Sequence, residues 1–423
     1  MENCTMNTTN FTLSEDFYTV PRLPWSILIT TTVIYVLIFF AGIIGNALVA
    51  FVVWKNHDMK SSTNYFLVNL SIADLLVLII CMPMALLETY VISPWLLGEA
   101  MCKLSPFLER TTAHASVLTL VSVAIERYYA ICHPLKAQYK CTTGKTIKIC
   151  LLIWIIASLS TVPNIISTVH EAVIDGNGNT VYECRTYTLS IASEIYMMII
   201  IPVLFFGLPL LILIVLYSLI IRTLHYANPA LKSEDSRTIS FTPHKVVTRE
   251  GLGKHKVSRK LTASRQVLTG SVHETILEKE EQGQEQKLLA NTAVQASERA
   301  RTRVVYMLLT VVTLFFLCLL PERVVNLYFT LAPNEDLISL GVNGHLSLAI
   351  FCRVMFYMNS AVNPIVYNIA STKFRAAFLR AVGIRKRNLG RIADIQLDPL
   401  ATEFIQRRHK MGIRISTKKL LGI

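Results

Sequence analysis

The fold is decided by residues 27–53, which have the sequence ILITTTVIYVLIFFAGIIGNALVAFVV and contain no charged side chain. A helix needs about 20 apolar residues to cross the roughly 30 Å hydrocarbon core of a bilayer. Backbone groups cannot stay unpaired in hydrocarbon, so such stretches must be helical. Six further stretches meet the requirement, at residues 65–91, 101–131, 147–169, 195–222, 304–331 and 342–369. The sequence therefore predicts an all-α membrane protein, a bundle of seven transmembrane helices.

The overall composition excludes several other classes of protein. Of the 423 residues, 52% are hydrophobic and 16% are charged, whereas a soluble domain carries about 25% charged residues. This balance excludes a soluble enzyme and a disordered chain. The sequence contains no HExxH, GxSxG or P-loop motif and no cluster of metal ligands. Nothing therefore indicates an enzyme, a cofactor or a bound metal.

The distribution of basic residues predicts which ends of the spans face the cytosol. The net charge is +13, and Lys and Arg gather at residues 55–60, 127–148 and from 373 onward, whereas the opposite loops are acidic or mixed. Because basic loops remain on the cytosolic side, we expect the N-terminus outside. The positive charge then lies beside anionic lipid, which excludes nucleic acid as a partner. Three glycosylation acceptors agree with this orientation: Asn3, Asn7 and Asn10.

Changes in composition divide the chain into three regions. Residues 1–26 form an extracellular glycosylated N-terminus, residues 27–370 the seven-helix domain, and residues 371–423 a cytoplasmic helix and basic tail. Within the helical domain, residues 227–300 are polar and poor in aromatic side chains, which predicts a long disordered cytoplasmic loop. Phe374, Phe378 and Leu379 fall on one helical face, which predicts a short amphipathic eighth helix on the inner leaflet.

Polar residues near the middle of the spans form one candidate site. A charged group in hydrocarbon costs at least a few kcal/mol, so Asp74 in the second span needs partners. Other polar residues lie at a similar depth on their own spans: Asn46, Ser116, Asn359, Ser360 and Asn363. Two interpretations stand side by side. One is an allosteric sodium ion held by Asp74 with Ser116, Asn359, Ser360 and Asn363, and the other is a hydrogen-bond network without an ion.

Charged residues also lie in the outer halves of the third, sixth and seventh spans. They are two acids, Glu109 and Glu322, and two bases, Arg323 and Arg353. They either pair with one another to hold the bundle together or line a polar cavity for a charged ligand. We favour the cavity, because stable apolar packing would not need them. Pro321 precedes Glu322 and removes a backbone hydrogen bond, which predicts a kink in the sixth span.

The two ends of the third span carry further signals. At the inner end, Arg127 is adjacent to Glu126 and can form an ion pair with it. At the outer end lies Cys102, and Cys184 lies in the loop between the fourth and fifth spans. Both cysteines are predicted outside, in an oxidising compartment, which favours a disulfide that pins the loop across the bundle mouth.

The order of short motifs along the spans resembles that of the rhodopsin-like G-protein-coupled receptors. The matching elements are Gly45-Asn46, residues 70–74, Cys102 with Cys184, Glu126-Arg-Tyr128, Trp154, Pro209 with Tyr217, Pro321, and Asn363-Pro-Ile-Val-Tyr367. The detail is similar to the peptide-receptor branch. Residues 126–138 (ERYYAICHPLKAQ) resemble thyrotropin-releasing hormone receptors. Residues 113–119 (AHASVLT) with 316–321 (FLCLLP) resemble ecdysis-triggering hormone receptors, which are related to neuromedin U receptors.

The resemblance implies a plasma-membrane receptor, not an enzyme, for an extracellular neuropeptide, expected to be short and C-terminally amidated. It implies coupling to a heterotrimeric G protein of the Gq type, which mobilises calcium. Arrestin and a receptor kinase are implied as further partners. The implied peptide-binding residues are Glu88, Glu109, Glu322, Arg323, Asn326, Phe329, Arg353 and Tyr357. The residues implied in activation and coupling are Glu126, Arg127, Tyr128, Pro134, Leu135, Pro209, Tyr217, Phe315, Pro321, Pro364 and Tyr367.

Some positions depart from the family's pattern. Leu319 stands where most members have tryptophan, and Glu322 stands where an aromatic residue is usual. Arg301 and Arg303 occupy the inner end of the sixth span, where an acidic partner for Arg127 is usual. We therefore hypothesise a weaker inactive-state contact and some basal activity.

Two rival functions are a transporter or channel and a ligand trap that does not signal. The absence of an internal repeat and of paired broken helices disfavours a transporter. The motifs at residues 126–128 and 363–367 argue for an intact coupling face, which disfavours a trap.

Overall fold

The computed structural model describes residues 23–91, 93–174, 178–187, 190–235, 292 and 299–381. Within these residues, seven helices are long and apolar enough to span a membrane, which confirms the predicted bundle. The chain divides into two compact units, Met1–Ser371 and Thr372–Ile423, and the seven helices belong to the first. Several predictions lie outside the described residues: the glycosylation sites Asn3, Asn7 and Asn10, most of the 227–300 loop, and the tail after Ala381.

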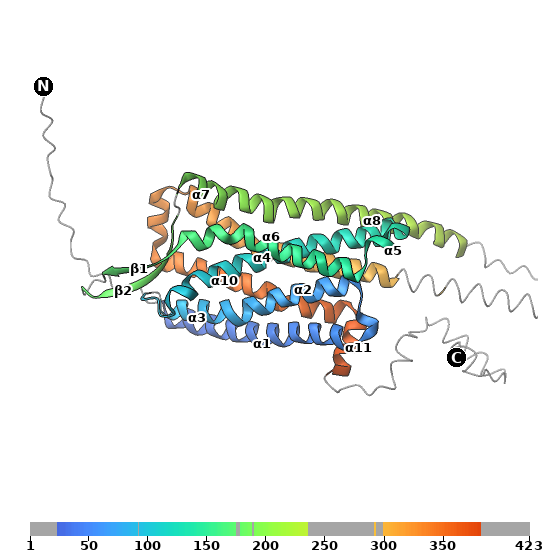
Figure 1. Cartoon of the computed structure of the whole chain (residues 1–423), viewed down its shortest axis with the longest axis horizontal. Helices are drawn as coiled ribbons and strands as arrows, with labels where there is room; N and C mark the ends of the chain where they lie inside the picture. Colours follow the sequence, from blue (N-terminus) through green and yellow to red (C-terminus); the bar gives the residue numbers. More distant parts are fainter. Residues whose placement is uncertain are drawn as a thin grey trace, which may run out of the picture. The chain divides into compact units, whose positions relative to one another are not determined.

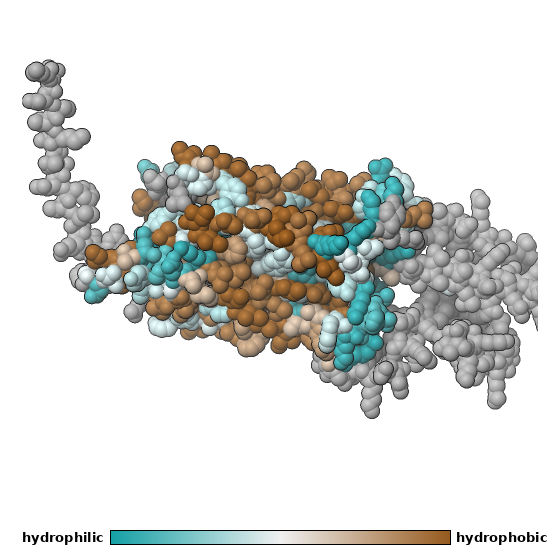
Figure 2. All heavy atoms as spheres, in the orientation of Figure 1, coloured by the Kyte–Doolittle hydropathy of each residue, from teal (hydrophilic) through white to brown (hydrophobic). Residues whose placement is uncertain are grey.

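Five of the spans are single helices that run alongside one another (Figure 1). They are α1 (Trp25–Lys55), α4 (Gly98–Cys132), α6 (Thr143–Ser167), the sixth span (Arg299–Leu331) and α10 (Asn334–Ala370). α10 contains one non-helical residue, Gly341, with φ of 62°, so its unbroken part begins close to the predicted residue 342. Figure 2 shows a broad hydrophobic band across the visible face of the helices, with hydrophilic residues towards both ends. A band of this kind matches the hydrocarbon core of a bilayer.

The second and fifth spans each contain π-helical turns. The second span consists of α2 (Ser62–Leu76), η2 (Val77–Cys81) and α3 (Met82–Tyr90). The fifth consists of α7 (Ile191–Ile195), η3 (Tyr196–Ile200), η4 (Val203–Gly207) and α8 (Leu208–Asp235). Prolines follow or precede these turns at Pro83, Pro202 and Pro209. A π turn inserts one extra residue into a helix and is often found at functional sites.

The elements at the ends of the spans refine the predicted boundaries. The turn η1 (His57–Met59) joins α1 to α2, and the helix α5 (Pro134–Lys140) lies in the basic link after α4. α8 continues to Asp235, so the loop predicted from residue 227 begins later than expected. The second unit contains α11 (Thr372–Ala381), in agreement with the predicted eighth helix. Its Phe374 and Phe378 rings share one face, with centroids 6.4 Å apart.

A β-hairpin that the sequence did not predict follows α6 directly. The fourth span was expected to reach residue 169, but it ends at Ser167 because β1 (Thr168–Ile174) begins at the next residue and pairs antiparallel with β2 (Thr180–Thr186). A disulfide joins Cys184 in β2 to Cys102 in α4, with a Cα–Cα distance of 5.7 Å, as expected. We call the end of the bundle that carries this hairpin the hairpin end, and the opposite end the Arg127 end.

Two glycines allow α1 to lie unusually close to its neighbours. A Cβ at Gly42 would lie 2.4 Å from a methyl of Leu78, and one at Gly45 would lie 2.7 Å from Cβ of Pro364. A Cβ at position 45 would collide with the rigid ring of Pro364, whereas one at position 42 would require the flexible Leu78 side chain to move. Residues of α1, η2, α3 and α10 form one apolar core here, centred on Tyr35, Leu78 and Tyr357.

Candidate functional site

The charged residues near the hairpin end are held by partners from different helices. Arg353 of α10 forms an ion pair with Glu88 of α3, and the hydroxyl of Tyr357 donates a hydrogen bond to Glu109 of α4. The Tyr357 ring also packs edge-on against Tyr35 of α1, with centroids 5.6 Å apart. These contacts connect four spans at one depth. A ligand that competes for either carboxylate would therefore change the packing between helices.

A second group of charges lies on α4 and the sixth span. Arg110, next to Glu109, interacts electrostatically with Glu322, with Arg323 and with Glu109 itself. Within the described part of the chain, Arg110, Glu322 and Arg323 take part in no ion pair. The Nε atom of Arg323 is buried and has no hydrogen-bond partner among the described residues. These side chains thus leave hydrogen-bonding capacity for a polar ligand, because buried donors are normally paired.

The four charges that the sequence singled out do not pair with one another. Arg353 pairs instead with Glu88, which the sequence placed in the binding set but not among the paired charges. Arg110 was missed, although its charge beside Glu109 within a span is visible in the sequence and carries the same cost in hydrocarbon. Together we call Glu88, Glu109, Arg110, Glu322, Arg323, Arg353 and Tyr357 the charge cluster.

One turn deeper along α4, a histidine joins three helices. The His114 ring stacks on Phe205 of η4, with centroids 3.9 Å apart and planes 13° apart. Its Nδ1 lies 2.9 Å from the hydroxyl of Ser160 in α6, and the carbonyl oxygen of Ser160 accepts a hydrogen bond from Tyr196. His114 was not predicted to have a role. Only the structure reveals the stack, because Phe205 lies far away in the sequence.

Two residues of the expected binding set lie further towards the hairpin end. Phe329 stacks on His345 of α10, with centroids 4.9 Å apart. The side chain of Asn326 makes no hydrogen bond to the charge cluster among the described residues, and its carbonyl oxygen accepts a bond from Thr330. The structure therefore does not join these two residues to the charge cluster.

The hairpin is fixed at the edge of the bundle by more than its disulfide. The backbone N–H of Trp95 donates to the carbonyl of Tyr182 in β2 at 2.7 Å. The hydroxyl of Ser93 donates to Glu183 at 2.9 Å, and Arg185 forms an ion pair with the same carboxylate at 2.5 Å. The hairpin is thus attached to the link between α3 and α4 as well as to α4 itself.

A small cavity of about 10 Å³ lies at mid-depth and brings together most of the proposed ion site. Oxygen-bearing side chains that line it are Asp74, Thr112, Ser116, Asn359 and Ser360, and of these only Thr112 was not expected from the sequence. Asn363 does not line the cavity but donates a hydrogen bond to Asp74 Oδ2 at 3.0 Å, and Asn46 donates to the carbonyl of Ser360 at 2.9 Å. The volume suits one water-sized occupant. Carboxylate and hydroxyl oxygens are also the donors that hard cations prefer, so the residues fit sodium.

The same cavity is closed on the side of the sixth span by Phe315 and Leu319. Phe315 is fully buried and packs edge-on against Phe316, with centroids 5.4 Å apart. Leu319, at the position where the family usually has tryptophan, therefore touches the space beside Asp74. Any rotation of the sixth span about Pro321 would reshape this cavity.

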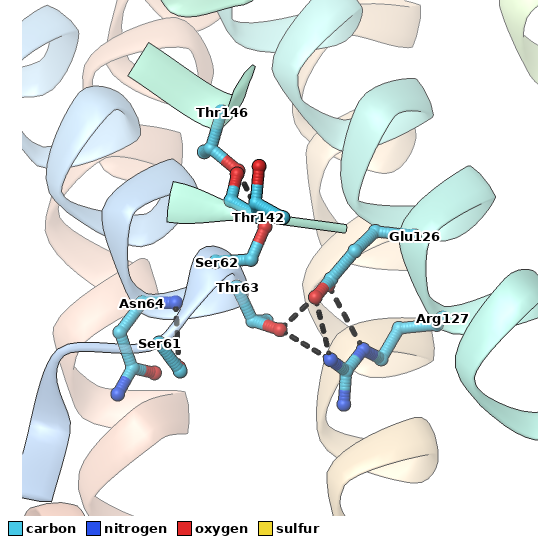
Figure 3. Close-up of polar contacts among 8 residues, drawn as sticks. All are labelled: Ser61, Ser62, Thr63, Asn64, Glu126, Arg127, Thr142 and Thr146. Carbon is cyan, nitrogen blue, oxygen red and sulfur yellow. Dashed lines mark hydrogen bonds and ion pairs between the residues drawn. The ribbon is translucent and has the colours of Figure 1, made fainter. Parts of the chain in front are cut away.

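At the Arg127 end, three residues form a compact network that we call the inner lock: Thr63, Glu126 and Arg127 (Figure 3). Arg127 donates to Glu126 from Nη2 at 2.8 Å and from Nε at 3.1 Å. The Thr63 hydroxyl donates to Glu126 Oε2 at 2.6 Å and lies 2.5 Å from Arg127 Nη2, which donates to it. Thr63 was not identified from the sequence. It provides from α2 a second contact for Arg127, whereas the inner end of the sixth span carries no acid.

Other residues expected in coupling lie on α4, α5, α8 and α10. Tyr217 is buried, interacts electrostatically with Arg127, and its hydroxyl has no hydrogen-bond partner among the described residues. Tyr128 approaches His133, with 3.3 Å between the hydroxyl and Nε2. Pro134 begins α5, where Leu135 is 80% exposed. Tyr367 of α10 is fully buried, and Pro364 of the same helix faces Gly45.

Comparison with known proteins settles the family. Residues 45–367 match the family described as 7 transmembrane receptor (rhodopsin family). The chain belongs to this family. It is similar to growth hormone secretagogue receptor type 1 of Sus scrofa, with 29% identity over 382 residues, covering 89% of this chain and 87% of the relative. The receptor of the same name from Mus musculus is 29% identical over 394 residues, covering 91% and 90%. The chain is therefore a multi-pass membrane receptor of the rhodopsin family.

Proposed function

We propose that the protein is a receptor for an extracellular neuropeptide and passes the signal to a heterotrimeric G protein. The observation that carries the proposal is the placement of two polar sites on one helix. The charge cluster lies near one end of α4, and Arg127 of the inner lock lies at the other. Seventeen helical steps separate Arg110 from Arg127, or about 26 Å of rise. A ligand at one end can thus affect a partner at the other only through movement of the helices.

The hairpin end faces the cell exterior in this proposal. The basic links at residues 55–60 and 127–148 lie at the Arg127 end, where the positive-inside rule places cytosol. The disulfide between Cys102 and Cys184 suits an oxidising exterior, and the N-terminus with its three acceptors is then outside. The receptor resides in the plasma membrane.

The ligand is a short peptide, and we infer that it is C-terminally amidated. Charged and hydrogen-bonding side chains of the charge cluster, which come from four spans, would meet its polar groups, and the hairpin beside them would meet its remainder. Glu109 is the counter-charge for a basic ligand residue. Arg110 and Arg323, which form no ion pair among the residues that the structure describes, would bind carbonyl or acidic groups. The relatives named as secretagogue receptors support a signalling ligand.

Binding shifts an equilibrium between two arrangements of the helices. To make the open arrangement predominate, a ligand must bind it more tightly than the resting arrangement, and the difference in binding free energy must exceed the free energy that separates the two states. Pro321 and Pro209 with the π turn η4 are the pivots, and Phe315 is the packing element that changes place. Arg127 then leaves Glu126 and meets Tyr217 and Tyr367. The space between α8 and the sixth span accepts a G-protein helix, and Leu135 adds an exposed apolar contact.

Three finer features complete the proposal. A sodium ion occupies the cavity beside Asp74 and stabilises the resting arrangement, and the five oxygen-bearing side chains that line the cavity support this assignment. The G protein is of the Gq type and releases calcium. A receptor kinase and arrestin end the signal by acting on the cytoplasmic loop and tail.

The test is a screen of amidated neuropeptides on cells that express the full chain, with calcium release and nucleotide exchange on a panel of G proteins as readouts. Arg127→Ala is the matched control, since it should reach the surface and bind peptide without signalling. The proposal predicts exchange with the wild type alone. Ion flux or substrate uptake without nucleotide exchange would establish the transporter instead, and peptide binding without exchange would establish a ligand trap.

A further inference from the structure

Both π turns at the hairpin half of the fifth span are held by the same two residues, His114 of α4 and Ser160 of α6. In η4, the Phe205 ring stacks on the His114 ring, with centroids 3.9 Å apart. In η3, the hydroxyl of Tyr196 donates to the carbonyl oxygen of Ser160 at 2.9 Å. His114 Nδ1 and the Ser160 hydroxyl lie 2.9 Å apart and complete the group. We call these four residues the anchor ring, and none of them belongs to the charge cluster or the inner lock.

The direction of each hydrogen bond in the anchor ring follows from its neighbours. The Ser160 hydroxyl donates its single hydrogen to the carbonyl oxygen of Ala157 at 2.8 Å. It can therefore only accept from His114, so Nδ1 of His114 is the donor. His114 is 2% exposed, so water cannot readily replace this bond. The orientation of the imidazole ring against Phe205 is thus fixed by α6.

The π turns are the reason that Tyr196 and Phe205 reach the same two neighbours. The two residues are nine positions apart, which is two and a half turns of regular α-helix. In a regular helix they would therefore lie on opposite sides of the span. Each π turn inserts one extra residue, and the insertions bring the two side chains back towards one side. The anchor ring can form only while the fifth span keeps this register.

A change of register would alter what the inner half of the span presents. One residue corresponds to about 100° of rotation in an α-helix, so a π turn that reverted to α-helix would rotate one half of the span relative to the other by about that angle. The half after η4 is α8, in which Tyr217 interacts electrostatically with Arg127. In the same helix, Thr223 Oγ1 lies 3.3 Å from Cys132 Sγ of α4. The register therefore decides which side chains of α8 meet α4 near the inner lock.

The anchor ring is also adjacent to the charge cluster. His114 follows Arg110 by four residues, so the two side chains lie on one face of α4, one turn apart. His114 interacts electrostatically with both Arg110 and Arg323. A ligand group held by these two arginines would therefore act on the turn of α4 that holds η4.

We propose that His114 is a positioning residue that, together with Ser160, keeps the fifth span in the register with both π turns. When the stack on Phe205 is lost, η4 reverts to regular α-helix and the two halves of the span rotate relative to each other. This effect on the register does not depend on signalling. Only its consequence rests on the proposed function: a ligand at Arg110 and Arg323 loosens the stack, and Tyr217 then turns relative to the inner lock.

The test measures distances between genetically encoded spin labels in the purified full-length chain in lipid nanodiscs. One label replaces Ile191 or Leu211, which lie in the two halves of the fifth span, and the other replaces Leu37 of α1. These side chains are 77%, 60% and 65% exposed, so the labels disturb little packing. A variant that lacks Leu204 removes the extra residue from η4 and defines the distances of the reverted register.

Two substitutions of His114 separate its two contacts. His114→Asn keeps a donor for Ser160 but has no ring, whereas His114→Phe keeps a ring. We expect His114→Asn to raise the population with the reverted distances about two- to ten-fold, as expected for the loss of an aromatic stack. Adding Tyr196→Phe should raise it by a similar factor again, and His114→Phe should restore the wild-type distances. Phe206→Leu is the matched control and should leave the distances unchanged, because Phe206 also lies in η4 but packs on Phe316 of the sixth span.

The double variant His114→Asn/Tyr196→Phe gives the decisive result. Wild-type distances alone in this variant would overturn the proposal and leave the anchor ring as ordinary packing between helices. An equal second population in Phe206→Leu would overturn it as well. If the His114 variants do not fold, Phe205→Leu removes the stack from the other side and must show the second population. If the variant without Leu204 does not fold, the second population is judged against the wild-type distances. A wild type that shows these distances but no nucleotide exchange would refute the proposed function and leave the register intact.

Discussion

Replacing Thr63 with valine is the most direct test of the inner lock. Valine keeps nearly the same shape but has no hydroxyl, so the change removes two contacts, the bond to Glu126 at 2.6 Å and the bond from Arg127 at 2.5 Å. Thr63 is 5% exposed, so water cannot readily replace the hydroxyl. Arg127 would then be held by Glu126 alone.

The size of the effect follows from these contacts. A hydrogen bond to a charged group contributes about 1.5–3 kcal/mol. We count the loss of the Thr63 hydroxyl as one such contribution to the stability of the resting arrangement, because Arg127 and Glu126 remain paired with each other. Each 1.4 kcal/mol is about ten-fold in an equilibrium. If about 1% of resting receptors are in the open arrangement, Thr63→Val should raise that fraction to between about 10% and 60%.

The assay is agonist-independent nucleotide exchange on a panel of G proteins, at matched surface expression. Ser62→Ala is the control, because it removes the neighbouring buried hydroxyl, which bonds to Thr146 and does not contact the inner lock. We expect high basal exchange in Thr63→Val and wild-type exchange in Ser62→Ala. Equal basal exchange in both variants would refute the role assigned to Thr63, whichever G protein couples.

Three further predictions concern the other sites. Glu109→Gln should weaken peptide potency about ten-fold or more, as expected for the loss of a charge-assisted hydrogen bond to the ligand. Tyr357→Phe frees the same carboxylate from its hydrogen bond and should change potency less. Dose–response curves that show unchanged potency in Glu109→Gln would rule out a ligand-binding role for Glu109. Asp74→Asn should abolish the effect of sodium on agonist affinity. If radioligand binding to the Asp74→Asn variant responded to sodium as the wild type does, the proposed ion site would be refuted. Cys184→Ser should lower agonist binding because the hairpin loses its bond to α4, and normal binding by a surface-expressed variant would contradict that account.

The seven spans could be predicted because burial in hydrocarbon leaves a signal in single stretches of sequence. The ends of the spans were less certain, because they depend on short-range pairing. The fourth span ends early since Thr168 pairs with Thr186 in the hairpin, and hydropathy alone does not distinguish such a strand from a helix end. The π turns η2, η3 and η4 likewise leave no periodic pattern that a short window can detect.

The candidate sites were predicted in kind, and the ion pair between Glu126 and Arg127 was predicted with its partner, but most other contacts were not. An ionisable residue in a span is conspicuous, so Asp74, Glu109 and Arg353 could be singled out. Which groups meet depends on the rotation of each helix about its axis, and that is set by packing across the whole bundle. Thr63 carries no charge and lies in the first turn of α2, so its contact with Arg127 could not be foreseen from the sequence.

The close approach of α1 to α10 has a practical consequence for measuring motion. Gly45 lets α1 pack directly against Pro364 of α10, because a methyl group at position 45 would lie 2.7 Å from that proline's Cβ. We expect this close packing to hold the two helices together while the sixth span moves. Spectroscopic labels placed one on α1 and one on the sixth span should therefore report displacement of the latter alone, which gives distance measurements on this receptor an unambiguous origin.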